Sequence, residues 1–183
     1  MVEAMAGKVL YHVTMSLDGF IAGPGDSMDW MFGYQGPAPA GAAQVIATTG
    51  AVLTGRRLYD MGVSLPGARP YGGAWSGPIF VLTHRPPAEE DPAVTFLSDG
   101  VRDAVATALA AAGDRNVVLF GASIPRQCIE EGLLDEILVH VMPVLLGDGV
   151  RLFARTDAPP VELEKLGVAE SGQLTDLRFR VLR

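Results

Sequence analysis

Glycine, basic and hydroxyl residues follow three predicted strands, and their types indicate an anion-binding site. The letters TGRRLYD place Gly55, Arg56 and Arg57 between an apolar run and a helix. The sequence THR (83–85) follows a second apolar run, and GASI (121–124) opens a helix after a third. A helix N-terminus favours an anion, and a guanidinium binds phosphate through two hydrogen bonds. Because such residues recur after successive strands, we expect a long ligand with several phosphates.

Each of these features also has a simpler interpretation. Arginines at the start of a helix are commonly solvated surface residues, and a glycine after a strand commonly serves a turn. The sequence contains neither GxGxxG nor GxxxxGK[ST], the two common nucleotide-binding fingerprints. The residues alone therefore favour an anion site without identifying its ligand.

Alternating strands and helices must position these residues. Runs rich in β-branched and aromatic residues predict strands, and apolar stripes with a helical period predict helices. The expected strands are 8–17, 51–55, 79–83, 93–98, 116–121 and a long strand from about 136; the expected helices are 41–48, 56–62, 99–114 and one from about 122 that stops at Gly132. Alternating runs over 161–182 predict an antiparallel hairpin. This order predicts an α/β protein with a mainly parallel sheet, in which ligands bind beyond the carboxyl ends of the strands.

Composition and charge exclude several classes of protein. The 183 residues are 49% hydrophobic and 19% charged, as in a folded chain with a substantial core. The net charge of −7 disfavours a nucleic-acid partner. No apolar run approaches the roughly 20 residues that span a bilayer, and no targeting segment is apparent. We therefore expect a cytoplasmic protein with no membrane partner.

Cysteine and histidine usage does not indicate a metal site. Cys128 is the only cysteine, and its apolar neighbours favour a core position. His12, His84 and His140 are scattered, with no spacing typical of a local metal site. We expect no bound metal.

Five motifs, in their order along the chain, resemble one known family. They are SLDGFIA, TGRRLYD, VLTHRPP, VVLFGASI and LLDEILVHVMPVLLGDGVRLF. Together they look like the dihydrofolate reductase-like family that includes the reductase domain of the bifunctional riboflavin-biosynthesis deaminase-reductase. The resemblance covers nearly the whole chain. It implies a single domain over 1–183, a three-layer α/β fold with a C-terminal antiparallel hairpin, NADPH as cofactor and a homodimer.

The resemblance also implies roles for the residues after the strands. Gly55, Arg56 and Arg57 would hold phosphates; Thr83, His84 and Arg85 would surround the adenosine 2′-phosphate; Gly121, Ala122, Ser123 and Ile124 would hold the pyrophosphate and the nicotinamide ribose. Arginine at a 2′-phosphate site favours NADPH over NADH.

The stretch after the first strand, AGPGD (22–26), would be a lid over the nicotinamide and the substrate. Trp30 or Trp75 would supply an aromatic wall. In the alternative interpretation Trp30 plugs the edge of the core and the glycines form a surface loop. Asp18 is the preferred acid for a substrate contact or a proton network, and an Asp-Gly turn explains it equally well. Asp26 and Asp29 are the other nearby acids.

Two departures from the family pattern narrow the function. Folate reductases of this fold carry an acid on the first helix, whereas 41–48 offers only Gln44 and Thr48 as polar residues, so folate reduction is not expected. Paired glycines after the cofactor strand are replaced by Gly121-Ala122, which leaves the geometry of that peptide bond open. The His/Cys zinc signature of a deaminase is also absent.

These observations predict an NADPH-dependent reductase of a small heterocyclic, carbonyl or imine substrate. The nearest named activity is 5-amino-6-(5-phosphoribosylamino)uracil reductase of riboflavin biosynthesis. The alternative is a non-catalytic nucleotide- or pterin-binding protein on the same fold. The long strand from about 136 is expected near the dimer contact. The sequence identifies neither the substrate nor the proton donor.

Overall fold

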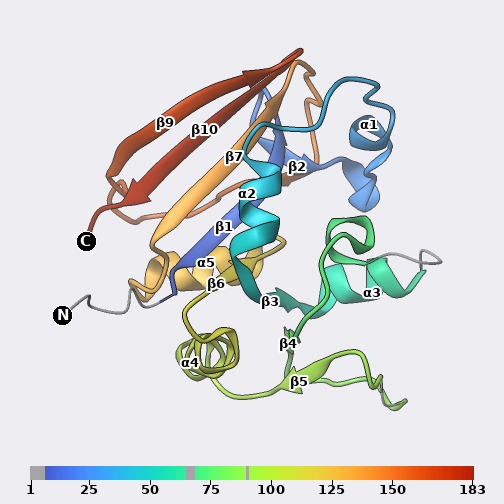
Figure 1. Cartoon of the computed structure of the whole chain (residues 1–183), viewed down its shortest axis with the longest axis vertical. Helices are drawn as coiled ribbons and strands as arrows, with labels where there is room; N and C mark the ends of the chain where they lie inside the picture. The colour runs from blue at the N-terminus through green and yellow to red at the C-terminus, as the bar shows by residue number, and fades with distance from the viewer. Residues whose placement is uncertain (1–6, 65–68, 90) are drawn as a thin grey trace.

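A computed structural model describes residues 7–64, 69–89 and 91–183. Its main sheet contains β1 (Val9–Ser16), β3 (Thr49–Gly55), β4 (Ile79–Leu82), β5 (Thr95–Leu97), β6 (Asn116–Leu119), β7 (Glu136–Met142), β9 (Leu163–Ser171) and β10 (Leu174–Val181). The strand order is β5-β4-β3-β6-β1-β7-β10-β9 (Figure 1). The strands from β5 to β7 are parallel, and β10 and β9 pair antiparallel. The predicted parallel sheet with an antiparallel C-terminal hairpin is confirmed.

Helices cover both faces of this sheet. They are α2 (Ala42–Thr48), α3 (Arg56–Ser64), α4 (Val101–Ala112) and α5 (Ser123–Glu130). Tyr11 and Cys128 belong to the larger apolar cluster, which α4 and α5 share with one face. On the other face, Val45 of α2 packs with Leu10 and Leu138. Successive residues of β1 therefore point into different layers, as the period of a strand requires. Among the described helices, none is long and apolar enough to cross a bilayer.

Short elements that the sequence did not predict surround the loop after β1. Strand β2 (Phe20–Ala22) pairs antiparallel with β8 (Val150–Arg151). The turn η1 (Pro24–Asp26) and the helix α1 (Asp29–Phe32) follow β2, and η2 (Pro70–Gly73) precedes β4. These elements are too short to carry a periodic apolar pattern. The β2–β8 ribbon ties the predicted lid to the segment that follows β7.

The long strand β7 lies inside the sheet and not at an edge. Both of its sides are hydrogen-bonded, to β1 and to β10. The outer strands of the sheet are β5 and β9. The expectation that this strand lies near a dimer contact stays a prediction, and such a contact would involve side chains, because an internal strand has no free backbone groups to offer a partner.

Candidate active site

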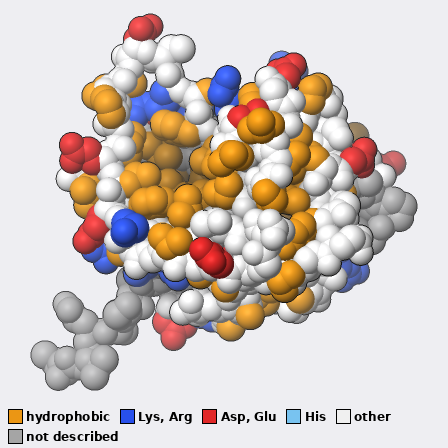
Figure 2. All heavy atoms as spheres, turned by 90° about the horizontal axis from the view of Figure 1, so that it is seen from above, with side chains coloured by type: hydrophobic (Ala, Val, Ile, Leu, Met, Phe, Trp, Pro, Cys, Tyr) orange, Lys and Arg blue, Asp and Glu red, His pale blue; other side chains and the backbone are white. Residues whose placement is uncertain are grey.

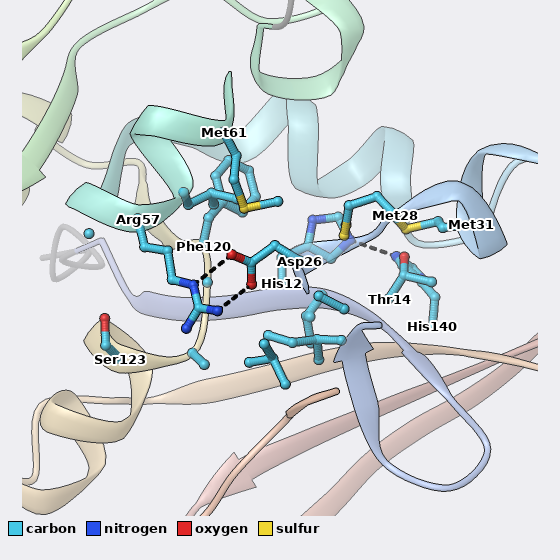
Figure 3. Close-up of a pocket in the computed structure, with 18 of the residues that line it drawn as sticks. His12, Thr14, Asp26, Met28, Met31, Arg57, Met61, Phe120, Ser123 and His140 are labelled. Atoms are coloured by element: carbon cyan, nitrogen blue, oxygen red, sulfur yellow. Dashed lines mark hydrogen bonds and ion pairs between the residues drawn. The ribbon is translucent and has the colours of Figure 1, made fainter. Parts of the chain in front are cut away.

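A cavity of about 460 Å³ opens at the carboxyl ends of β1, β3 and β6. Its walls include Thr14 of β1, Gly55 of β3 and Phe120 just after β6. Met28, Met31 and Met61 surround it from the lid side and from α3 (Figure 3). The place of the cavity agrees with the rule that parallel sheets bind ligands beyond their carboxyl ends.

The predicted pyrophosphate residues form one wall of this cavity. Gly55, Gly121, Ala122 and Ser123 all line it. Gly121 has a φ of +84°, a conformation that glycine adopts without strain. A Cβ atom on Gly55 would lie 3.1 Å from Ser123 Oγ, so the backbone and the start of α5 approach closely there. Ile124 does not line the cavity, because it is buried in the core.

The first turn of α5 offers the backbone N–H groups of Ser123 and Ile124 beside these glycines, whereas Pro125 has none. No side chain caps the helix at Ala122. The first amides of a helix have no partners within it, and they carry partial positive charge. The Gly121–Ala122 peptide is trans. This wall therefore has the backbone geometry and the electrostatics of an anion-binding site.

Arg57 lines the cavity and is paired with the lid. Its Nε lies 2.8 Å from Asp26 Oδ2, and its Nη2 lies 2.6 Å from Asp26 Oδ1 (Figure 3). The Arg57 side chain is 71% exposed and the Asp26 side chain 23% exposed. Among the described residues, Arg57 is the only arginine that lines the cavity, and the lid places the Asp26 carboxylate against it.

The other predicted phosphate residues lie outside the cavity, at the adjacent strand end. Arg56 donates a hydrogen bond to the carbonyl oxygen of Arg85, and its Nε lies 2.6 Å from Asp60 Oδ1. The backbone N–H of Arg85 donates to Thr83 Oγ1 at 3.1 Å. His84 and Arg85 are exposed. The structure therefore brings Arg56 and the 83–85 turn together on the surface.

Asp18 does not line the cavity. Its carboxylate accepts hydrogen bonds from Ser16 Oγ at 2.7 Å and from the backbone N–H groups of Leu146 and Gly147, at 3.0 and 2.7 Å. The hydrogen bond from Ser16 and those from the two amides lower the pKa of Asp18 to about 2. These contacts match the turn interpretation of Asp18, and a carboxylate so stabilised is a poor proton donor; its contact with substrate stays a prediction.

Neither tryptophan forms a wall of the cavity. Trp75 is buried, and its Nε1–H donates to the carbonyl oxygen of Thr49 at 3.0 Å, so it is a core residue. Trp30 lies on α1 and is half-buried; it is absent from the cavity lining. Met28 and Met31, on either side of Trp30, occupy the place expected for it.

Four side chains that the sequence analysis did not assign to the site form a buried hydrogen-bonded chain at the cavity. Tyr71 Oη lies 2.9 Å from His12 Nδ1, and His12 Nε2 lies 2.6 Å from His140 Nε2. His140 Nδ1 lies 2.6 Å from Asp176 Oδ1, while Asp176 Oδ2 accepts the backbone N–H of Gly41 at 3.1 Å. Burial and the neighbouring His140 lower the pKa of His12 to about 3. The first three residues line the cavity.

The strand register explains this chain. Asp176 of β10 lies directly opposite His140 of β7, and β7 is the parallel neighbour of β1, which carries His12. All three residues are buried, and His12 and His140 lie in mostly apolar strands. A histidine among apolar strand residues, as at positions 12 and 140, is a signal in the sequence that indicates a buried polar site. Without the register, nothing indicated that the three side chains meet.

Comparisons with known proteins identify the family. The model of the RibD C-terminal domain matches residues 7–175. The uncharacterized protein YwjB of Bacillus subtilis (strain 168) is 29% identical over 175 residues, which are 96% of this chain and 98% of that protein.

Solved structures share the fold. A putative riboflavin biosynthesis protein from Shewanella sp. PV-4 superposes with a TM-score of 0.80 at 24% identity, over 96% of this chain and 99% of that chain. A deaminase/5-amino-6-(5-phosphoribosylamino)uracil reductase from Thermotoga maritima has a TM-score of 0.68 at 18% identity, over 97% of this chain and 57% of that one. The sheet order, the cavity at its strand ends and these matches together place the chain in the RibD C-terminal domain family, a family of reductases with the dihydrofolate reductase-like fold.

Proposed function

We propose that this protein is an NADPH-dependent reductase of a small heterocyclic, carbonyl or imine substrate, built as a single domain. The observation that carries the proposal is the convergence of Gly55, Arg57 and the 121–123 turn on one cavity at the strand ends. Reductases of this kind need a site that holds a long anionic cofactor and an adjoining chamber for the substrate.

The residues of this chain fit such a cofactor. Gly121, Ala122 and Ser123 would hold the pyrophosphate with their backbone amides, because α5 begins there without a side-chain cap. Gly55 itself presents only backbone to that wall, because a Cβ atom there would lie 3.1 Å from Ser123 Oγ. Arg57 would add a charged contact. When bound, the nicotinamide supplies the hydride, and the protein supplies orientation and the proton.

A preference for NADPH over NADH is proposed from the residues at the ends of β3 and β4, beside the cavity. Arg56, Thr83 and Arg85 lie together at the ends of β3 and β4, with His84 next to them. The guanidinium groups of half-buried Arg56 and exposed Arg85, with the Thr83 hydroxyl, suit a dianionic 2′-phosphate. The 83–85 turn contains no acidic residue, and the acid at this surface is Asp60, whose carboxylate is paired with Arg56.

The substrate chamber is mainly apolar and aromatic. Met28, Met31, Met61, Tyr71 and Phe120 all line the cavity. Methionine and aromatic side chains pack well on the faces of a flat ring. This lining supports a ring or conjugated substrate, and the uracil reductase activity in the name of the Thermotoga maritima protein is the nearest candidate.

We also propose that the protein is a homodimer. The outer strand β9 exposes Leu163, Leu166 and Val168. One face of the molecule also gathers hydrophobic side chains around a hollow (Figure 2). Exposed apolar groups on an edge strand are typical of an interface. Light scattering at micromolar protein concentration tests this point: twice the mass of the chain supports the dimer, and a monomer contradicts it.

The proposed activity is tested by NADPH oxidation in the presence of aminopyrimidine, pterin and quinone substrates. We expect substrate-dependent loss of NADPH absorbance for at least one class. A variant Arg57→Ala should raise the KM for NADPH, whereas Arg102→Ala, which changes an exposed arginine on α4, should not. Saturable cofactor binding without turnover in any class would instead favour a nucleotide-binding protein.

A further inference from the structure

Tyr71, His12, His140 and Asp176 form a continuous hydrogen-bonded chain, which the fold alone does not require. These hydrogen bonds run from the carboxylate of Asp176 on β10 to the hydroxyl of Tyr71 at the cavity. His12 and His140 are 8% and 3% exposed. Burying two imidazoles and a carboxylate is unfavourable unless every polar atom is paired, and here each of them is.

The four hydrogen-bonded side chains permit only one arrangement of protons when both histidines are neutral. Ionised Asp176 accepts the Nδ1–H of His140, which leaves His140 Nε2 as an acceptor. His12 must then donate through Nε2–H, so its Nδ1 accepts the hydroxyl proton of Tyr71. In this state the Tyr71 hydroxyl donates inward, away from the cavity.

One added proton reverses the hydrogen bond between His140 and His12 and the hydrogen bond between His12 and Tyr71. His140 becomes an imidazolium beside Asp176 and donates through Nε2–H to His12. His12 stays neutral but changes tautomer, so that its Nδ1–H donates to the Tyr71 oxygen. The Tyr71 hydroxyl is then free to donate into the cavity.

The backbone of Tyr71 supports a functional role. Its φ of 56° and ψ of 32° are left-handed, which is uncommon for a residue with a large side chain. The conformation is held by its neighbours: the ring stacks on His12 at 5.6 Å between centroids and meets the edge of Phe120 at 5.5 Å. Such locally strained residues concentrate at functional sites.

We propose that Tyr71 is the catalytic proton donor to the substrate, and that His12, His140 and Asp176 are positioning residues that reload it. This inference rests on the proposed reductase function. Reduction of a C=O or C=N bond adds a hydride to carbon, which the nicotinamide supplies, and a proton to the heteroatom. The O–H bond of Tyr71 breaks as the new O–H or N–H bond of the substrate forms. The tyrosine oxygen takes the Nδ1 proton of His12, and His12 Nε2 takes the Nε2 proton of His140, so the chain returns to its neutral state.

Charges around the histidine pair limit it to one stored proton. His12 faces His140 on β7, Asp176 and Arg178 on β10 and Tyr71 on η2. Burial, the neighbouring imidazole and Arg178 lower the pKa of His12, and Asp176 opposes them. We place the stored proton on His140, because its Nδ1 lies 2.6 Å from Oδ1 of the Asp176 carboxylate.

The first test needs no substrate. The chain has only three histidines, so NMR of the ring nitrogens in isotope-labelled protein separates them. As the pH is lowered, we expect the His12–His140 pair to gain a single proton while His12 changes from the Nε2–H to the Nδ1–H tautomer in the same step. Two independent titrations, or a His12 that keeps one tautomer throughout, would overturn the relay. His84 is exposed and serves as the internal reference.

The second test measures turnover with any substrate reduced in the assay above. Tyr71→Phe keeps the ring and removes the hydroxyl; we expect kcat to fall about 100-fold or more with unchanged NADPH affinity. Asp176→Asn should shift the alkaline limb of the kcat pH profile, because turnover needs the stored proton and that proton is lost as the pH rises. Tyr11→Phe is the matched control, because Tyr11 is a buried tyrosine on the same strand as His12 and does not line the cavity. Unchanged kcat in Tyr71→Phe would overturn the proposal. Failure of NADPH to bind the unmodified protein would refute the reductase function instead, and the NMR titration still decides the relay.

Discussion

The lid carboxylate Asp26 and a cofactor phosphate would compete for Arg57, so removing the carboxylate should tighten NADPH binding. Asp26→Asn is the suitable change because Asp26 has a φ of 64°, and asparagine tolerates this left-handed conformation as well as aspartate does. Arg57 is 71% exposed, so water and salt screen the pair and its coupling is about 0.2–1 kcal/mol. Breaking this pair beforehand lowers the Kd for NADPH by a factor between about 1.4 and 5.

Calorimetric titration of NADPH at low ionic strength measures this change. Asp29→Asn is the matched control: it removes the same charge from the same loop, but Asp29 contacts Ser27 and not Arg57. The gain in Asp26→Asn should shrink as salt is added, since the pair is exposed. An unchanged or weaker affinity in Asp26→Asn, or an equal gain in Asp29→Asn, would refute competition for Arg57.

Three further predictions concern stability. Burial raises the pKa of Glu136, but hydrogen bonds from Lys8 and Arg178 outweigh burial and leave this pKa below its ordinary 4.5. The lowered pKa stabilises the folded protein above pH 4.5. This stabilisation is lost as the pH falls through the pKa that Glu136 has in the folded state. Glu136→Gln should therefore lower the free energy of unfolding by about 1–3 kcal/mol at neutral pH and flatten its acid dependence in urea titrations. Gly50→Ala should cost about 1–3 kcal/mol in the same titrations, because its Cβ would lie 2.7 Å from atoms of the last residue of α4; an unchanged midpoint would contradict this packing. Tyr11→Phe should raise the melting temperature by roughly 2–4 °C, because the buried hydroxyl has no partner among the described residues, and a lower melting temperature would show that the hydroxyl is satisfied.

The strand-end residues were predictable because local patterns determine them. Apolar runs located β3 and β6, and Gly55 and Gly121 follow these strands at the turns where the structure has them. Parallel strands bring their carboxyl ends to one edge, so the approach of Gly55 to Ser123 follows from topology.

The proton-bearing residues were not predictable, because they depend on pairing between distant strands. His140 and Asp176 meet only in the β7–β10 register, and His12 joins them from β1. Asp18 was preferred for its place after β1, yet its carboxylate is held by the amides of Leu146 and Gly147. Sequence spacing says nothing about such long-range contacts.

Titration of the protein with NADPH and with NADH, followed by calorimetry and by tryptophan fluorescence, tests the central claim most directly. We expect saturable NADPH binding, weaker NADH binding, and loss of the difference in Arg85→Ala, because the exposed guanidinium beside Arg56 would hold the 2′-phosphate. If neither nucleotide binds at millimolar concentration, the cavity at the strand ends does not hold a nicotinamide cofactor and the reductase function is contradicted.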